Sequence, residues 1–369
     1  MAATASAGTT GLPPTLTEGL GKSQLPALDG LRAIAALIVV FNHSGYSWVP
    51  ASLGVLAFFV LSGFLITWLL LKEHARTGDV SLKKFYARRS LRILPAFYVY
   101  WFLVVGSRLL LSRPLDGSQA IASFFYVNNY YQAIYGDPNT SLSHTWSLAV
   151  EEQFYLLWPL AFLVLSKCPT RMAKTLAAFI LFVWAYRIAL HLSGVPQHYV
   201  YEAFECRADQ LAIGCLLAVV LWQRRMGGFW KALCNHPSLA LATVSLLVLS
   251  SALYSYYSTP YRDTIGFIVE PVLVGALIVQ LVALPAGSPG WAFVNVGWMR
   301  YLGRISYSIY LYQQLVPNYS AKLHLPPALE LALSTAVTIA LASLSYYLVE
   351  RPFLRLKDRF EVSRAPAAA

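Results

Sequence analysis

An arginine and a histidine lie eleven residues apart within one apolar stretch, which runs from Leu28 to His43. Ionisable side chains at membrane depth are costly, and by default they mark a functional site or a specific partner. At about 100° per residue, Arg32 and His43 face nearly the same side of a helix, separated by roughly 16 Å along its axis. Arg32 could equally be a charge at a helix end that reaches water, and a histidine can be satisfied by a neighbouring carbonyl. His43 is too deep to reach water easily, so the spacing favours a chemical role for it, such as accepting a proton from a hydroxyl group.

A cluster of basic residues follows in the segment KKFYARRSLRILP. Arg92 comes three residues after Arg89 and four after Arg88, so the three can gather on one side of a helix start. Such a cluster suits a polyanionic ligand, for example a phosphate-bearing cofactor. A topology signal that contacts anionic lipids fits the spacing equally well. The sequence alone leaves both interpretations open.

Another ionisable group enters an apolar helix in the segment HTWSLAVEEQFYLLWP. His144 and Glu151 are seven residues apart and share one helix face, with Tyr155 close beside them. A carboxylate in a membrane helix needs a partner, which could be His43, Arg32 or a substrate hydroxyl. The alternative is a structural ion pair.

Other polar residues are candidates for contact with a substrate. Arg207 and Asp209 open a predicted helix at its outer end, where they could line an external cleft or simply pair. Ser306, Tyr310 and Gln313 share one face of a later predicted helix. That face could be a polar lining or could form ordinary hydrogen bonds between helices.

The composition is typical of a membrane protein, with 57% of the 369 residues hydrophobic and 12% charged. Apolar segments of spanning length recur, which predicts an all-α, polytopic bundle of about ten transmembrane helices. In the second of them, the small residues Ser62 and Gly63 allow close approach of another backbone. We expect the helices near residues 27–47, 52–72, 92–111, 146–166, 173–192, 208–223, 239–257, 265–284, 303–320 and 328–349. The aromatic stretch 119–135 is too short and indicates an interfacial or re-entrant segment.

The net charge of +11 is spread over short loops, as orientation signals are. No basic segment has the length or the aromatic interleaving of a nucleic-acid surface. With a cytoplasmic N-terminus, 22 of the 28 basic residues lie on the inner side. We therefore expect a protein of the inner (plasma) membrane with both termini cytoplasmic, a disordered tail at 1–24 and a basic tail at 354–369. The four cysteines show no metal-type spacing, so no metal site is expected.

Taken together, these segments resemble the membrane acyltransferase 3 family, whose members O-acetylate cell-surface polysaccharides and similar acceptors. The matching segments occur in the family's order: LDGLRAIAALIVVFNH, GVLAFFVLSGFLI, FYARRSLRILP, HTWSLAVEEQFYLLWP, RADQLAIG, GRISYSIYLYQ and ERPF. The resemblance implies one membrane domain over residues 25–353. One departure is visible, because many members have a histidine where this chain has Gln313.

The resemblance also implies roles for individual residues. The family's essential intramembrane histidine matches His43, and the arginine eleven residues before it matches Arg32. The family's paired arginines match Arg89 and Arg92. Its acidic residue in the SLxxEEQFY pattern matches Glu151.

These matches imply an acyl transfer across the membrane. The donor would be acetyl-CoA or another short acyl-CoA from the cytoplasm, used as a substrate rather than bound permanently as a cofactor. Arg88, Arg89 and Arg92 would hold its phosphates, and the pantetheine arm would reach up to His43. Glu151 would orient the imidazole or position the acceptor, a hydroxyl of a cell-surface carbohydrate or glycolipid. Direct transfer and an acyl-histidine intermediate both remain open.

Two rival classes remain. A transporter or flippase for a glycan or lipid would also bury charge, although the chain has no inverted repeat and its basic cluster sits at one mouth only. A structural scaffold would give His43 no purpose. Release of free CoA that depends on an acceptor would separate all three.

Overall fold

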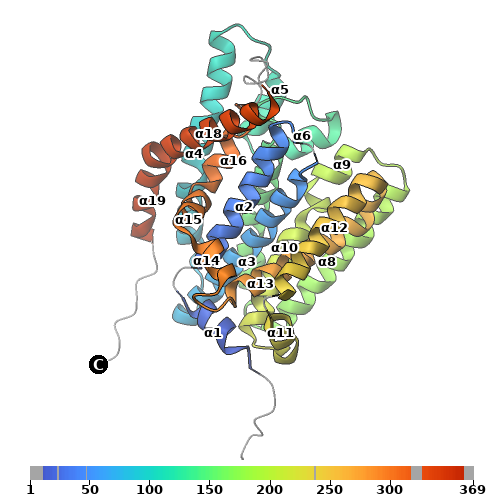
Figure 1. The fold of residues 1–369 in the computed structure, drawn as a ribbon, viewed down its shortest axis with the longest axis vertical. Coiled ribbons are helices and arrows are strands. Elements are labelled where there is room, and N and C mark those ends of the chain that lie inside the picture. The colour runs from blue at the N-terminus through green and yellow to red at the C-terminus, as the bar shows by residue number, and fades with distance from the viewer. Residues whose placement is uncertain (1–10, 23–24, 47, 237, 317–325, 361–369) are drawn as a thin grey trace, which may run out of the picture.

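The computed structural model describes residues 11–22, 25–46, 48–236, 238–316 and 326–360, and every regular element in these ranges is helical (Figure 1). The long helices are α2 (Pro26–His43), α3 (Ala51–Thr77), α4 (Leu82–Leu110), α7 (Thr145–Leu165), α8 (Pro169–Leu192), α10 (Ala208–Trp222), α12 (Ser238–Tyr261), α13 (Phe267–Val282) and α18 (Pro327–Ser345). Shorter α-helices are α1 (Pro14–Gly21), α5 (Gly117–Phe124), α6 (Asn128–Tyr135), α9 (Gln197–Glu202), α11 (Gly227–Cys234), α14 (Pro289–Asn295), α15 (Gly297–Arg304), α16 (Ser306–Tyr312) and α19 (Arg351–Lys357). Single turns of 3-10 or π-helix complete the set: η1 (Phe204–Cys206), η2 (Arg262–Gly266), η4 (Tyr346–Glu350) and η5 (Asp358–Phe360).

Within the described residues, seven helical segments are long and apolar enough to cross a membrane, so this is a multi-pass membrane protein. The sequence predicted about ten spans, and helices do occur near all ten expected positions. α10 falls short because it has 15 residues. α12 and α13 belong to one apolar segment of 45 residues. The backbone at Ser258 is not helical, however, and the two helices pack against each other. The helix expected at 303–320 is interrupted at Ile305 between α15 and α16, and 317–320 lie outside the described residues.

α3 lies at the centre of the bundle and packs against α2, α7, α10 and α13. Its contact with α10 is a close backbone crossing built on two glycines. A Cβ added to Gly63 would lie 1.9 Å from the carbonyl oxygen of Leu211, and one added to Gly214 would lie 2.1 Å from that of Val60. Neither position can hold a side chain without moving a helix. The predicted close approach at the second expected helix is confirmed.

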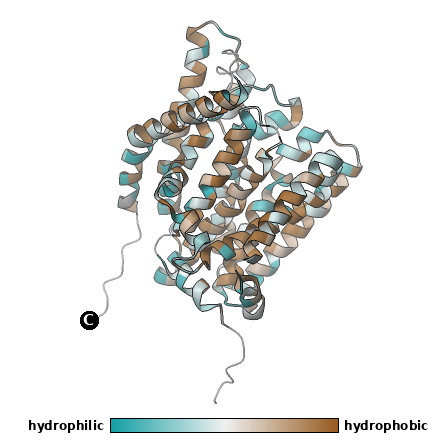
Figure 2. Ribbon diagram, viewed as in Figure 1, coloured by the Kyte–Doolittle hydropathy of each residue, from teal (hydrophilic) through white to brown (hydrophobic). Residues whose placement is uncertain are grey.

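The outer faces of the long helices are apolar. Large side chains such as Leu156, Val164 and Phe182 are exposed there. In Figure 2 hydrophobic residues run along the long helices, while hydrophilic residues gather towards the helix ends. Such a surface suits the hydrocarbon core of a bilayer.

Two helix starts differ from expectation. The third expected helix, 92–111, begins ten residues early as α4, because Ser81 caps it by accepting a hydrogen bond from the Lys84 N–H at 3.4 Å. The first turns of α4 are charged, so a pattern of apolar residues does not predict them. Residues 14–21, expected in a disordered tail, form α1 because Leu16 and Leu20 lie on one face and are buried, with α1 packing against α13.

The ends of two other expected segments also change. Residues 354–357, where the basic tail was expected to begin, are helical and belong to α19. The aromatic stretch 119–135 forms α5 and α6, each of 8 residues, with a break at Tyr126, where φ is 55°. Neither helix is long enough to span, which confirms that this stretch is not a transmembrane helix. α5, α6 and α9 lie at one end of the bundle and α1 and α11 at the other (Figure 1).

Candidate active site

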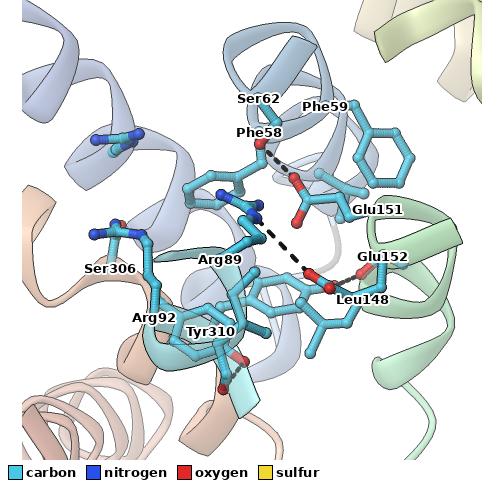
Figure 3. A pocket seen from close by; sticks show the side chains of 15 residues that line it. Phe58, Phe59, Ser62, Arg89, Arg92, Leu148, Glu151, Glu152, Ser306 and Tyr310 are labelled. Atoms are coloured by element: carbon cyan, nitrogen blue, oxygen red, sulfur yellow. Dashed lines mark hydrogen bonds and ion pairs between the residues drawn. The ribbon is translucent and has the colours of Figure 1, made fainter. Parts of the chain in front are cut away.

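A pocket of about 80 Å³ lies between α2, α3, α4, α7 and α16 (Figure 3). Residues far apart in the sequence supply its charged and polar lining. Chief among them are Arg32, Arg89, Arg92, Glu151, Glu152 and Tyr310. Five of these six were singled out from the sequence, and the structure brings them to one cavity.

Three arginines from two helices converge on this pocket. Arg32, from α2, contacts Asp29 at 3.2 Å. Arg89 lies over the ring of Tyr155 at 3.5 Å. It also forms an ion pair with Glu152 at 3.9 Å (Figure 3). Arg92 has no carboxylate within ion-pair distance in the described part of the chain. Several guanidinium donors are therefore left for an anionic ligand.

Arg88 does not join this cluster. Its guanidinium forms an ion pair with Glu73 at 2.7 Å and donates to the carbonyl of Phe360 at 3.0 Å. It therefore ties α4 to the end of α3 and to η5 instead of lining the pocket. The expectation that Arg88, Arg89 and Arg92 form one group is wrong, because spacing along a helix does not reveal which neighbouring acid captures each side chain. The third arginine of the pocket is Arg32 instead.

Glu151 is held by two hydroxyl groups. Its carboxylate accepts a short hydrogen bond from Ser62 (Figure 3) and another from Tyr155 at 3.1 Å. Neither His43 nor Arg32 is among its hydrogen-bond or ion-pair partners in the described residues, contrary to expectation. Seven residues separate it from His144 at the start of α7, so it lies about 10 Å deeper along the axis. The helical periodicity gave the correct face but not the depth.

His43 lies outside the pocket lining, at the last turn of α2. One ring nitrogen, Nδ1, is 2.9 Å from the carbonyl oxygen of Val39. The other, Nε2, is 3.2 Å from the side-chain nitrogen of Gln314. The imidazole is half-buried. It is therefore fixed by two hydrogen bonds and still reachable.

A chain of polar contacts joins the pocket to His43. Tyr310 lines the pocket, shares a short hydrogen bond with Ser147, and donates to the carbonyl of His144 at 3.2 Å. The Nδ1 atom of His144 is 3.0 Å from the side-chain oxygen of Gln314, which contacts His43 through its nitrogen. The rings of Tyr310 and His144, with centroids 5.5 Å apart, lie between the pocket lining and His43 along this series of contacts.

Gln314 was missed by reasoning from the sequence. Attention fell on the preceding Gln313, because the family often has histidine there. Gln313 is fully buried, and its amide forms no hydrogen bond with the described residues. The only signal for Gln314 was an amide at the end of a helix whose polar face already included Tyr310.

The other two substrate candidates lie elsewhere. Arg207 is fully buried among aromatic rings, including Phe267 at 4.1 Å and Tyr201 at 4.9 Å, and none of its nitrogens is hydrogen-bonded within the described residues. Asp209 pairs with Arg187 at 3.0 Å, with both side chains fully buried. The expected Arg207–Asp209 pair does not form, and neither residue lines the pocket.

Arg187 also escaped the sequence analysis. It sits in α8, where a single arginine in an apolar helix was a usable signal. Close to this cluster, on the short helix α9, burial raises the pKa of the Glu202 carboxyl to about 8, and the charge of Asp137 adds to the effect. Glu202 is therefore largely protonated near neutral pH and does not balance the charge of Arg207.

Comparison with known proteins identifies relatives of this chain. The chain is 32% identical over 363 residues to the peptidoglycan O-acetyltransferase OatA of Listeria monocytogenes, covering 91% of this chain and 57% of that protein. It is 30% identical over 352 residues to the O-acetyltransferase OatA of Staphylococcus aureus, covering 89% and 57%. The chain thus spans just over half the length of these relatives. No solved structure matches it. The family described as an acyltransferase domain matches residues 25–347, which is most of the chain, and the chain belongs to that family.

Proposed function

We propose that this chain is an integral-membrane O-acyltransferase that moves an acetyl group from cytoplasmic acetyl-CoA to a glycan hydroxyl on the outer side of the plasma membrane. One observation carries the proposal: Arg32, Arg89 and Arg92 converge on a pocket whose wall is connected to His43. The names of the related OatA proteins support acetyl as the group and peptidoglycan as the class of acceptor.

The pocket arginines would bind the phosphates of the donor. Guanidinium groups form strong charge-assisted hydrogen bonds to phosphate oxygens. Arg92, without an ion-pair partner among the described residues, has the most donors to offer. The long pantetheine arm would then extend past the side chains of Tyr310 and His144 and bring the thioester to His43. Glu151 lies too deep to support the imidazole, so its role would be to position the donor.

His43 would handle the proton in the transfer. The acceptor hydroxyl gives its proton to Nε2 while its oxygen attacks the thioester carbonyl. The carbon–sulfur bond breaks, an ester forms, and the proton passes from the imidazole to the departing thiolate to give free CoA. In the stepwise variant, Nε2 attacks the thioester carbonyl, the carbon–sulfur bond breaks and CoA leaves as the thiolate. The acceptor hydroxyl then attacks the acetyl-imidazole, the ester forms as the carbon–nitrogen bond breaks, and the hydroxyl proton goes to the thiolate to give free CoA.

The proposal requires that the pocket and α5 face opposite sides of the membrane. Ala75, in the last turn of α3, and Ser118, in the first turn of α5, are both exposed. In a background without Cys168 and Cys234, an impermeant thiol reagent should label Ser118→Cys in intact cells and Ala75→Cys only after the cells are broken. The reverse pattern would contradict donor entry from the cytoplasm.

The activity itself is tested with purified protein in liposomes. With acetyl-CoA and soluble peptidoglycan fragments, we expect free CoA to appear at a rate that depends on the fragments, together with acetylated glycan. Movement of glycan across the membrane without CoA release would indicate a transporter. No CoA release and no movement would contradict the proposal and favour a structural role.

A further inference from the structure

Gln314 lies between the two histidines of the site. Its side-chain nitrogen is 3.2 Å from Nε2 of His43, and its side-chain oxygen is 3.0 Å from Nδ1 of His144. The same oxygen is 3.3 Å from the backbone nitrogen of His144. One amide thus connects the end of α2 to the start of α7.

Two backbone groups determine which atom donates and which atom accepts in each of the hydrogen bonds that run from His144 through Gln314 to His43. The backbone N–H of His144 can only donate, so the atom of Gln314 that faces it must be the oxygen. The amide nitrogen, a donor, then faces Nε2 of His43, which must accept. The carbonyl of Val39 can only accept, so Nδ1 of His43 carries the proton. Both ends select the same tautomer of His43.

We infer that Gln314 is a positioning residue for the acyl transfer: it holds His43 as the Nδ1–H tautomer with the Nε2 lone pair directed at the place where the acceptor hydroxyl must donate. This inference rests on the proposed function. The amide N–H occupies the position of a donor hydroxyl and is displaced by it. Once Nε2 is protonated, it faces the amide N–H with no acceptor between them, which favours passage of the proton to the thiolate.

Few other ionisable groups surround His43. Asp137, in the loop before α7, interacts with His43 electrostatically at longer range, and so does His144. The half of α3 from Ala51 to Phe64 carries no ionisable side chain. The remaining ionisable side chains on helices that pack against α2 are Lys72, Glu73, His74 and Arg76 on the other half of α3, Glu270 on α13, Arg300, Tyr301 and Arg304 on α15, Tyr307, Tyr310 and Tyr312 on α16, and Glu330 on α18. The described residues show no hydrogen bond from any of these to His43.

Three variants separate positioning from simple packing. Gln314→Glu keeps an oxygen for the N–H groups of His144 but replaces the donor to His43 by an acceptor. Gln314→Leu removes both contacts. Gln313→Leu is the matched control, because this neighbouring amide, which is fully buried where Gln314 is half-buried, forms no hydrogen bond within the described residues. The readout is the dependence of kcat on pH for acetyl transfer, with expression and the KM for acetyl-CoA measured alongside.

We expect Gln314→Glu to shift the acid limb of the profile to higher pH by about one unit or more, because a carboxylate stabilises the protonated imidazole, which cannot act as base. Gln314→Leu should lower kcat by about tenfold or more with little change in KM. Gln313→Leu should resemble the wild type. A wild-type profile and rate for Gln314→Glu would overturn the inference, even if Gln314→Leu fails to fold. Loss of activity in His43→Ala beside a normal Gln314→Glu would refute Gln314 alone, whereas an active His43→Ala would refute the proposed function.

Discussion

Two groups of arginines in this protein differ in how their charge is balanced. In the group around Asp209, Arg187 is fully buried, pairs with Asp209 at 3.0 Å, and donates to the carbonyls of Cys206 at 2.8 Å and Phe267 at 3.1 Å. In the pocket group, Arg92 lines open space and has no carboxylate within ion-pair distance among the described residues. The first arginine is paired with a carboxylate of its own chain, and the second has no such partner in the described part of the chain.

The difference shows what marks a binding site in a membrane bundle. A buried charge is costly wherever it lies, so its presence alone does not separate structure from function. Unused donors that line a cavity do separate them. By this criterion the pocket arginines are the group proposed to bind a ligand, and the Arg187–Asp209 pair serves the fold.

The largest expected effect is on the Arg187–Asp209 pair. Arg187→Met leaves the carboxylate of Asp209 buried with the indole N–H of Trp184 as its remaining side-chain donor among the described residues. Breaking a buried pair in this way costs about 3–5 kcal/mol. Thermal unfolding in detergent should show a marked loss of stability. The double variant Arg187→Met with Asp209→Leu should recover most of it, and a stable single variant would show that the pair is not structural.

Neutralising the pocket arginines should change binding and leave the fold intact. Arg89→Gln combined with Arg92→Gln should raise the KM for acetyl-CoA by about tenfold or more, since each charge-assisted hydrogen bond contributes about 1.5–3 kcal/mol. Initial rates over a range of acetyl-CoA concentrations measure it. The matched control is Arg88→Gln, outside the pocket and still able to donate to Glu73. A double variant with the KM of this control would show that the cluster sets topology and does not bind the donor.

A smaller effect is expected at the carboxylate of the pocket. Ser62→Ala removes one hydrogen bond to Glu151 and leaves the one from Tyr155. A single hydrogen bond of this kind contributes about 0.5–1.5 kcal/mol, so kcat/KM should fall by roughly two- to tenfold. An unchanged kcat/KM would mean that the orientation of Glu151 does not matter for transfer.

Much of the fold could be predicted from the sequence, because apolar length alone places most of the long helices. Hydropathy did not find α1, which is held by Leu16 and Leu20, or the charged start of α4. These segments are stabilised by particular neighbours and by a cap at Ser81, which an average over apolar residues does not register.

The site was predictable to the extent that one helix determines it. Helical spacing correctly grouped Arg89 with Arg92 and identified Glu151 and Tyr310 as inward-facing. Spacing within a helix says nothing about the height at which two helices meet. For that reason the sequence left open whether Glu151 meets His43, Arg32 or a substrate hydroxyl, and beside His43 the structure has the amide of Gln314 from another helix end.

The central claim is that the pocket binds the donor and His43 performs the chemistry, and His43→Ala tests it most directly. In liposomes with acetyl-CoA and peptidoglycan fragments, acceptor-dependent release of CoA should fall by about a hundredfold or more. Binding of acetyl-CoA, followed by isothermal titration calorimetry of the same preparation, should be unchanged. His236→Ala, at an exposed histidine bonded to Ser238, is the control and should behave as wild type. Release of CoA within tenfold of the wild-type rate in His43→Ala would contradict the account.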